Sequence, residues 1–78
     1  MPSSLEFTIE PFVEGRPGPH VTAGIAAVEG TGCAVEVGPF GTTATGERAA
    51  VLDAVDALCR AAAAAGAERV SLQLTLSP

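Results

Sequence analysis

The stretch VEVGPFGTTATG, residues 35–46, decides the fold of this chain. Apolar and polar residues alternate up to Val37, the pattern breaks at GPFG (residues 38–41), and alternation resumes with threonines. Period-2 alternation is typical of strands, and glycine with proline is typical of tight turns. We therefore predict two antiparallel strands, 33–37 and 42–45, joined by a hairpin. The hairpin either sets backbone angles only or also presents a ligand site.

One strand and one helix are predicted before the hairpin. Residues 5–12 alternate until Pro11 stops the strand, and the side chains expected to point inward are those of Leu5, Phe7 and Ile9. Proline suits the first turn of a helix, which places a helix start at Pro19. The apolar face of this helix recurs with helical spacing at Val21, Ile25 and Val28. Glycines then end it, at Gly30 and Gly32.

A longer helix and a last strand are predicted after the hairpin. Glu47 is expected in the first turn, where an acid complements the helix dipole, and Gly66 is expected at the C-cap. The predicted buried stripe consists of Val51, Val55, Leu58 and Ala62, widened by Leu52 and Cys59. In the strand 69–76 the inward side chains are Val70, Leu72, Leu74 and Leu76, and in the strand 33–37 they are Cys33, Val35 and Val37.

The resulting order, β-α-β-β-α-β, is that of a ferredoxin-like α+β fold. The right-handed crossover rule places both helices on one face of a four-stranded antiparallel sheet. We expect one domain over residues 1–78, with an ordered core of about 4–76. A chain of this length buries only about 60% of the surface that its unfolded form exposes, so its stability is marginal. Oligomerisation is the expected source of additional stability.

Charge and composition exclude several classes of function. The formal net charge is −5, with nine acids against four bases, and all four bases are arginine. A surface without a basic cluster disfavours nucleic acid and anionic membranes as partners. A chain without lysine can form neither a Schiff base nor a Walker-type phosphate site. We found no signal peptide and no apolar run long enough to span a membrane, so the expected location is the cytoplasm.

Catalysis and metal binding are not expected. His20 is the only histidine, and a lone histidine at a helix start is more often a surface or capping residue than a general base. Cys33 and Cys59 form no C-x-x-C pair, and both are expected to be reduced, buried small hydrophobes. The sequence therefore predicts a protein that is not an enzyme and that holds neither a cofactor nor a metal.

The outward face of the predicted sheet is rich in hydroxyl and amide side chains. It carries Glu6, Thr8, Glu10, Glu36, Thr43, Thr45, Ser71, Gln73 and Thr75. Antiparallel sheets commonly leave one face in water, which is the simpler interpretation. Solvated faces usually carry more lysine and glutamate, however. A polar seam between protomers or a ligand platform is the other interpretation, and both stay open at this point.

Four segments, in order and with matching spacing, resemble the thiamine-binding protein family of small ferredoxin-like domains. They are the hairpin VEVGPFGT, the strand end TIEPF, the helix start GPHV and the closing GAERVSLQLTL. The resemblance implies reversible, non-catalytic binding of thiamine or its hydroxymethylpyrimidine portion by a homodimer or homotetramer that acts as a carrier, buffer or sensor. Two alternatives stay open: an oligomeric interaction module without a small ligand, and a regulatory domain for another metabolite.

The resemblance also implies a set of ligand-binding residues. Thiamine is a cation with an aminopyrimidine edge, so its pocket needs apolar walls, a carboxylate and hydrogen-bonding groups. The residues that match these needs are Phe12 and Phe40 as walls, Glu10 or Glu36 as the carboxylate, and Gly41, Thr42 and Thr43 as hydrogen-bonding groups. Three positions depart from the family pattern: His20, which is also a candidate ligand-binding residue, stands where tyrosine is common, Thr45 replaces an acid, and Glu10 replaces an apolar residue. These changes either retune the pocket or mark a member of the family that no longer binds thiamine.

Overall fold

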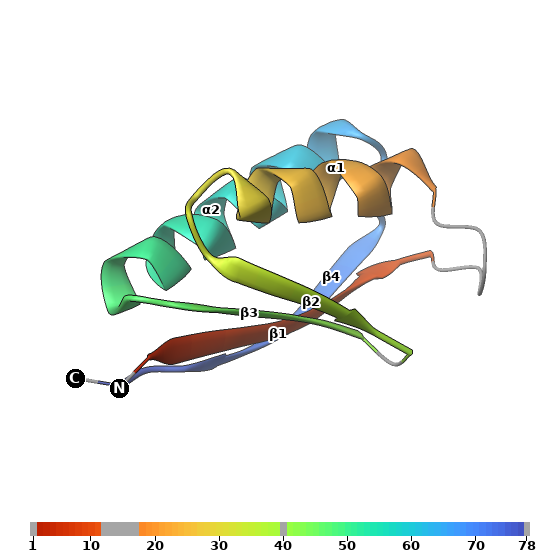
Figure 1. Ribbon diagram of the computed structural model, residues 1–78. Coiled ribbons are helices and arrows are strands. Elements are labelled where there is room, and N and C mark those ends of the chain that lie inside the picture. Colours follow the sequence, from red (N-terminus) through yellow and green to blue (C-terminus); the bar gives the residue numbers. More distant parts are fainter. Residues whose placement is uncertain (1, 12–17, 40, 78) are drawn as a thin grey trace.

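The computed structural model describes residues 2–11, 18–39 and 41–77. Its elements follow one another as β1 (Ser3–Glu10), α1 (Pro19–Glu29), β2 (Ala34–Gly38), β3 (Gly41–Gly46), α2 (Arg48–Ala64) and β4 (Arg69–Thr75). The strands form one antiparallel sheet in the order β2-β3-β1-β4. Both helices lie on the same side of this sheet (Figure 1). The predicted ferredoxin-like α+β fold is confirmed.

The element boundaries follow local chemistry. β1 ends at Glu10, because Pro11 has no N–H for the strand ladder; the predicted extension to Phe12 lies outside the described residues. α1 begins at Pro19, as predicted. α2 begins at Arg48, so Glu47 is the N-cap residue rather than a member of the first turn.

Gly66 terminates α2 in a Schellman arrangement. Its φ angle of 98° lies in the left-handed region, which glycine adopts without steric cost. The N–H of Ala67 donates to the carbonyl of Ala62 at 2.9 Å, and the N–H of Gly66 donates to that of Ala63 at 3.2 Å. Two carbonyls that the helix leaves without partners are thereby satisfied, and the chain turns towards β4.

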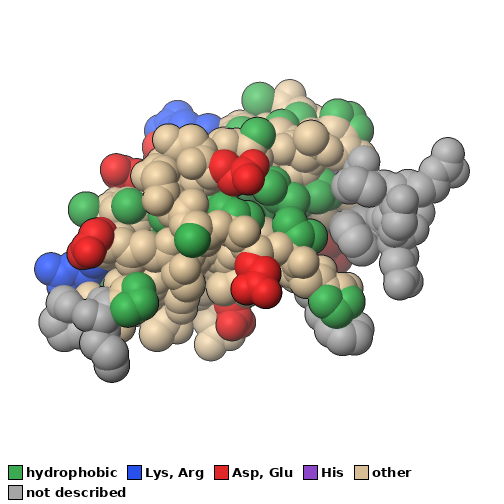
Figure 2. Space-filling view, in the orientation of Figure 1, with side chains coloured by type: hydrophobic (Ala, Val, Ile, Leu, Met, Phe, Trp, Pro, Cys, Tyr) green, Lys and Arg blue, Asp and Glu red, His purple; other side chains and the backbone are tan. Residues whose placement is uncertain are grey.

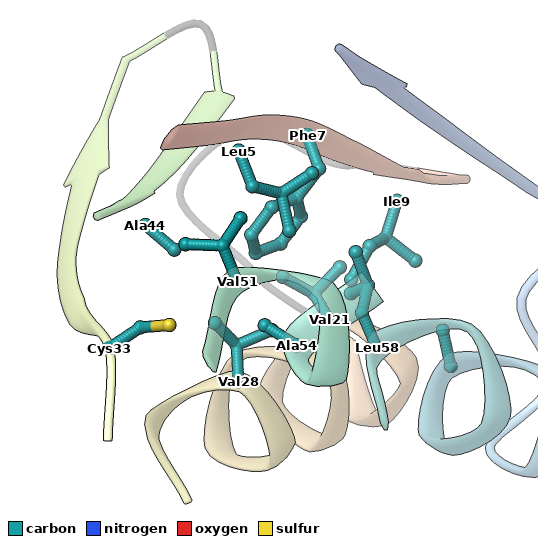
Figure 3. Packing of buried hydrophobic residues seen from close by; sticks show 11 residues of the cluster. Leu5, Phe7, Ile9, Val21, Val28, Cys33, Ala44, Val51, Ala54 and Leu58 are labelled. Carbon is teal, nitrogen blue, oxygen red and sulfur yellow. The ribbon is translucent and has the colours of Figure 1, made fainter. Parts of the chain in front are cut away.

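The hydrophobic core lies between the sheet and the two helices (Figure 3). Among the strands, central strand β1 contributes the most side chains to this core, because the helices cover all the side chains on its inward face. The buried apolar residues are Leu5, Phe7, Ile9, Val21, Val28, Cys33, Ala44, Val51, Ala54, Leu58 and Ala62. Fully burying a leucine or phenylalanine contributes about 1.5–3 kcal/mol. This cluster therefore carries most of the fold's stability.

The buried stripe of α2 is narrower than predicted. It consists of Val51, Ala54, Leu58 and Ala62, with Val55 half-buried. Leu52 and Cys59 each follow a buried residue directly, and one residue is a rotation of about 100° around the helix. Their side chains are consequently exposed, so the prediction of a buried Cys59 was wrong, whereas Cys33 is buried as expected.

The helix layer covers the middle of the sheet and leaves its edges open. One inward row crosses all four strands through Val37, Thr42, Phe7 and Leu72. Thr42 and Phe7, on the central strands, are 7% and 3% exposed, whereas Val37 and Leu72, on the edge strands, are 65% and 39% exposed. Val37 faces the helix side as predicted but is not covered by it. The β2–β3 hairpin diverges from the helices at this end (Figure 1).

At the opposite end of the sheet, the first and last strands are tied together. The Ser3 hydroxyl accepts a hydrogen bond from the Ser77 N–H at 2.9 Å and donates one to the Ser77 carbonyl at 3.4 Å. Ser3 is fully buried, so these bonds satisfy a hydroxyl that water does not reach. The start of β1 and the segment that follows β4 lie side by side here (Figure 1).

Candidate functional site

Rows of polar side chains cross the face of the sheet that the helices leave uncovered. We call this face the open face. One row runs from edge to edge through Glu36, Thr43, Glu6 and Gln73, each residue being the register partner of the next. Directly opposite residues in a sheet have side chains within reach of one another. Two carboxylates, a hydroxyl and an amide thus stand in one line across the sheet.

A hollow of about 550 Å³ lies on this face at the hairpin end of the sheet. Its volume falls within the range of about 300–1,000 Å³ that is usual for small-molecule sites. The described residues that line it are Glu6, Phe7, Thr8, Gly38, Pro39, Gly41, Thr42, Thr43, Ser71, Leu72 and Gln73. A second, smaller hollow of about 270 Å³ adjoins it across Thr43 and includes Glu36.

Two paired glycines account for the position of the larger hollow. Gly38 and Gly41 are register partners at the end of the hairpin, and the next strands contribute Thr8 and Ser71, which pair with each other. The glycines leave half of this row without side chains. A Cβ atom on Gly41 would lie 3.4 Å from the Thr8 methyl and 3.2 Å from the Phe7 carbonyl oxygen. A side chain at position 41 would therefore crowd the floor of the hollow.

The charges around the hollow are predominantly negative. Glu6 lines it directly, and none of its described lining residues is basic. Arg69 and Glu10 are register partners at the end of β1, and the Arg69 Nε lies 3.4 Å from a Glu10 carboxylate oxygen. In the view of Figure 2, acidic side chains are scattered over the surface and basic ones are sparse. A neutral or cationic ligand suits this environment.

The structure brings three of the predicted ligand-binding residues together. Gly41, Thr42 and Thr43 all line the larger hollow. Strand alternation turns the Thr42 side chain to the helix side, however, so it borders the hollow chiefly through its backbone, while the Thr43 side chain is on the open face. Glu36 lies in the same row as Thr43 and lines the adjoining hollow.

The remaining predicted residues lie elsewhere. Glu10 is on the open face beyond Thr8, in the ion pair with Arg69. His20, in the first turn of α1, hydrogen-bonds through Nε2 to the Pro11 carbonyl, which requires the Nε2 nitrogen to be the donor. It is not among the lining residues of either hollow. Phe12 and Phe40 lie outside the described residues.

Several lining residues were absent from the predicted set. They are Glu6, Phe7, Thr8, Gly38, Pro39, Ser71, Leu72 and Gln73. Four of them already stood on the predicted polar face, so the signal was present in the alternation of residues 5–12 and 69–76. The missing information was the register, which shows that these side chains lie beside the hairpin rather than elsewhere on the face.

Within the described ranges, no group of histidine, cysteine, aspartate and glutamate side chains is arranged to hold a metal ion. The same ranges contain no helix that combines the length and apolarity needed to cross a bilayer.

Comparisons with known proteins place these features in context. The sequence matches the family described as thiamine-binding protein over residues 5–77. A solved domain of unknown function from Bacillus cereus is 30% identical, with a TM-score of 0.72 over 99% of this chain and 77% of that one. A Thermotoga maritima protein, provisionally assigned to thiamine biosynthesis or salvage, is 30% identical, with a TM-score of 0.70 over 99% of this chain and 85% of that one.

More distant structures share the fold alone. A Streptococcus pneumoniae protein is 20% identical, with a TM-score of 0.64 over 100% of this chain and 89% of that one. No functionally curated protein matches the chain significantly.

Proposed function

Because the chain belongs to the thiamine-binding protein family, we propose that it binds thiamine, or the hydroxymethylpyrimidine portion of thiamine, in the larger hollow of the open face. The observation that carries this proposal is the hollow beside the glycine-paired hairpin end, lined by a carboxylate, hydroxyls and an amide. This hairpin is also the most specific part of the sequence resemblance to the family.

The side chains of the hollow match the functional groups of an aminopyrimidine. Its amino group is a donor, for which Glu6 and Gln73 offer acceptor oxygens, and its ring nitrogens are acceptors, for which Thr43 and Ser71 offer hydroxyl donors. The glycine pair lets a flat ring approach the backbone closely. We assign the specificity of the site to these open-face side chains.

The proposed role is binding without catalysis, as a carrier, buffer or sensor. The family description names binding rather than a reaction. The ionisable side chain among the described lining residues is Glu6, and His20 makes its hydrogen bond to Pro11 rather than lining the hollow. A single carboxylate can orient a ligand and offset its charge without the acid and base pair that most hydrolytic chemistry uses.

We further propose that the chain works as a homo-oligomer. The hollow is open to the side facing away from the helices, so one protomer covers a ligand from one side only. Exposed apolar side chains occur on both sheet edges and beyond β4, at Val37, Leu72 and Leu76. The alternative is an interaction module without a small ligand, in which the open face is a subunit interface, and ligand titration separates the two.

The first experiment is titration calorimetry of the purified protein with thiamine and with hydroxymethylpyrimidine, with the oligomeric mass measured by light scattering. We expect saturable binding at micromolar concentration or tighter. Thr43→Val should weaken it about three- to tenfold, because one hydrogen bond contributes about 0.5–1.5 kcal/mol. Thr45→Val is the matched control, since Thr45 lies on the same face of β3 but outside the larger hollow.

A folded oligomer that gives no heat with either compound would contradict the binding proposal. Loss of assembly in Thr43→Val, with no binding by the parent protein, would instead identify the open face as a subunit interface.

A further inference from the structure

The ionisable groups on the open face are unevenly placed around the larger hollow. Glu6 lies inside it, and Glu36 lies in the same row, on the far side of Thr43. The described base on this face, Arg69, stands in the row beyond Ser71 and is engaged by Glu10 at 3.4 Å. Of the other described arginines, Arg60 pairs with Asp56 on α2, and Arg48 begins that helix.

We propose that the hollow selects ligands by charge, taking a thiazolium cation with a free hydroxyl and discriminating against its phosphate esters, and that Glu6 is the residue responsible. This inference rests on the proposed function. Thiamine carries one permanent positive charge, whereas a phosphate monoester adds about −1.5 to −2 at neutral pH. The same ring system is therefore attracted by the carboxylates in one form and repelled in the other.

The position of Glu6 makes it a stronger determinant than its neighbours. It is on central strand β1, and the two residues that flank it in its row, Thr43 and Gln73, line the hollow as it does. Glu36 is on edge strand β2 and lines only the adjoining smaller hollow, so it lies farther from a ligand in the larger one. We expect Glu36 to contribute in the same direction but less.

Arg69 defines the opposing possibility. A phosphate tail directed along β4 would approach this guanidinium, and arginine is well suited to binding phosphate. Binding it would require the phosphate to displace Glu10 or to share the guanidinium with it. We therefore expect Arg69 to contribute less than the repulsion by Glu6.

The test is calorimetric titration with four probes: hydroxymethylpyrimidine, thiamine, thiamine monophosphate and thiamine diphosphate. We expect thiamine to bind at least about tenfold more tightly than either ester, a lower bound that corresponds to charges about 4 Å apart screened as in bulk water. Glu6→Gln should bring this ratio close to one, because it removes the negative charge. The glutamine oxygen still accepts from the amino group, and any loss of affinity for the pyrimidine portion is common to all four probes and cancels in the ratio. Raising the salt concentration should reduce the ratio in the parent protein.

The outcomes separate this inference from the function on which it rests. If the pyrimidine and thiamine bind and the esters bind equally or more tightly, charge selection is wrong and the proposed function stands. If the parent protein prefers thiamine to the esters and Glu6→Gln keeps the same preference, the assignment to Glu6 is wrong. If no probe binds to the folded protein, both proposals fail. Arg69→Gln should leave the ratio unchanged or increase it; a decrease in the thiamine preference would also contradict the inference.

Discussion

The two faces of β1 share one backbone but differ in burial and in the chemistry of their side chains. Leu5, Phe7 and Ile9 point to the helices and are almost completely buried, whereas Glu6, Thr8 and Glu10 point away and remain partly or fully accessible. Because the strand period is two residues, adjacent positions serve opposite faces. Stability and recognition are therefore encoded on alternate residues of the same segment. A substitution on the helix side should therefore change stability, and a substitution on the open face should change ligand binding, wherever along the chain it lies.

The largest expected effect is on the helix side. Leu58 is fully buried between α2 and the sheet, so Leu58→Ala should lower the free energy of unfolding by about 2–5 kcal/mol. Urea denaturation measures this loss, and calorimetry on the fraction that stays folded should show unchanged thiamine affinity. Leu52→Ala, on the exposed side of the same helix, should change stability by no more than about 0.5 kcal/mol. Similar losses in both variants would contradict the described orientation of α2.

A middle-sized effect is expected on the open face. Gly41→Ala adds a Cβ beside Thr8 and the Phe7 carbonyl, which crowds the hollow. Overpacking of this kind lowers the free energy of unfolding by about 1–3 kcal/mol. Thiamine affinity should fall about tenfold or more, as measured by calorimetry. Gly46→Ala is the matched control at the other end of β3, where the new Cβ would meet Cys33 Sγ at 3.4 Å and Ala50 Cβ at 3.9 Å. Its affinity should equal that of the parent, and an equal loss in both variants would place the ligand elsewhere.

The smallest effect concerns a surface that belongs to neither sheet face. Arg60 donates to Asp56 at 2.9 Å one helical turn away, with both side chains largely in water. Exposed pairs at this spacing contribute about 0.3–0.5 kcal/mol. Arg60→Ala should therefore shift the urea midpoint only slightly and leave binding unchanged. A loss above about 1 kcal/mol would indicate that the outer side of α2 is covered in the assembled protein.

The fold could be predicted largely from alternation and helical spacing. Residues 5–10 and 69–75 alternate without interruption, and Pro19 and Gly66 mark helix ends in accord with the structure. The errors share one cause: hydrophobicity alone does not show how far each element is covered. Leu52 and Cys59 are apolar but rotated away from the core, and Val37 points to the helix side where no helix reaches it.

The site was harder to predict because it depends on which residues of different strands stand side by side. The alternation of β1 identifies Glu6 and Thr8 as open-face residues, but only the register places them beside Thr43 and Gly41. Register is a property of paired strands, so no single segment contains it. The same reason explains why Thr42 and Thr43, neighbours in sequence, present their side chains to opposite faces.

The hydrogen bonds between Ser3 and Ser77 have a consequence for engineering this protein. They hold together two residues separated by 74 positions, so a short flexible linker could join Ser77 to Ser3 without crossing the sheet. Circular permutation succeeds where the original ends are close and the new ends fall in an exposed turn. The turn after α1, where Gly32 has a φ angle of 88° and open space around its α-carbon, offers such a point. A permutant cut there would leave the hairpin intact and would begin with the strand that enters it.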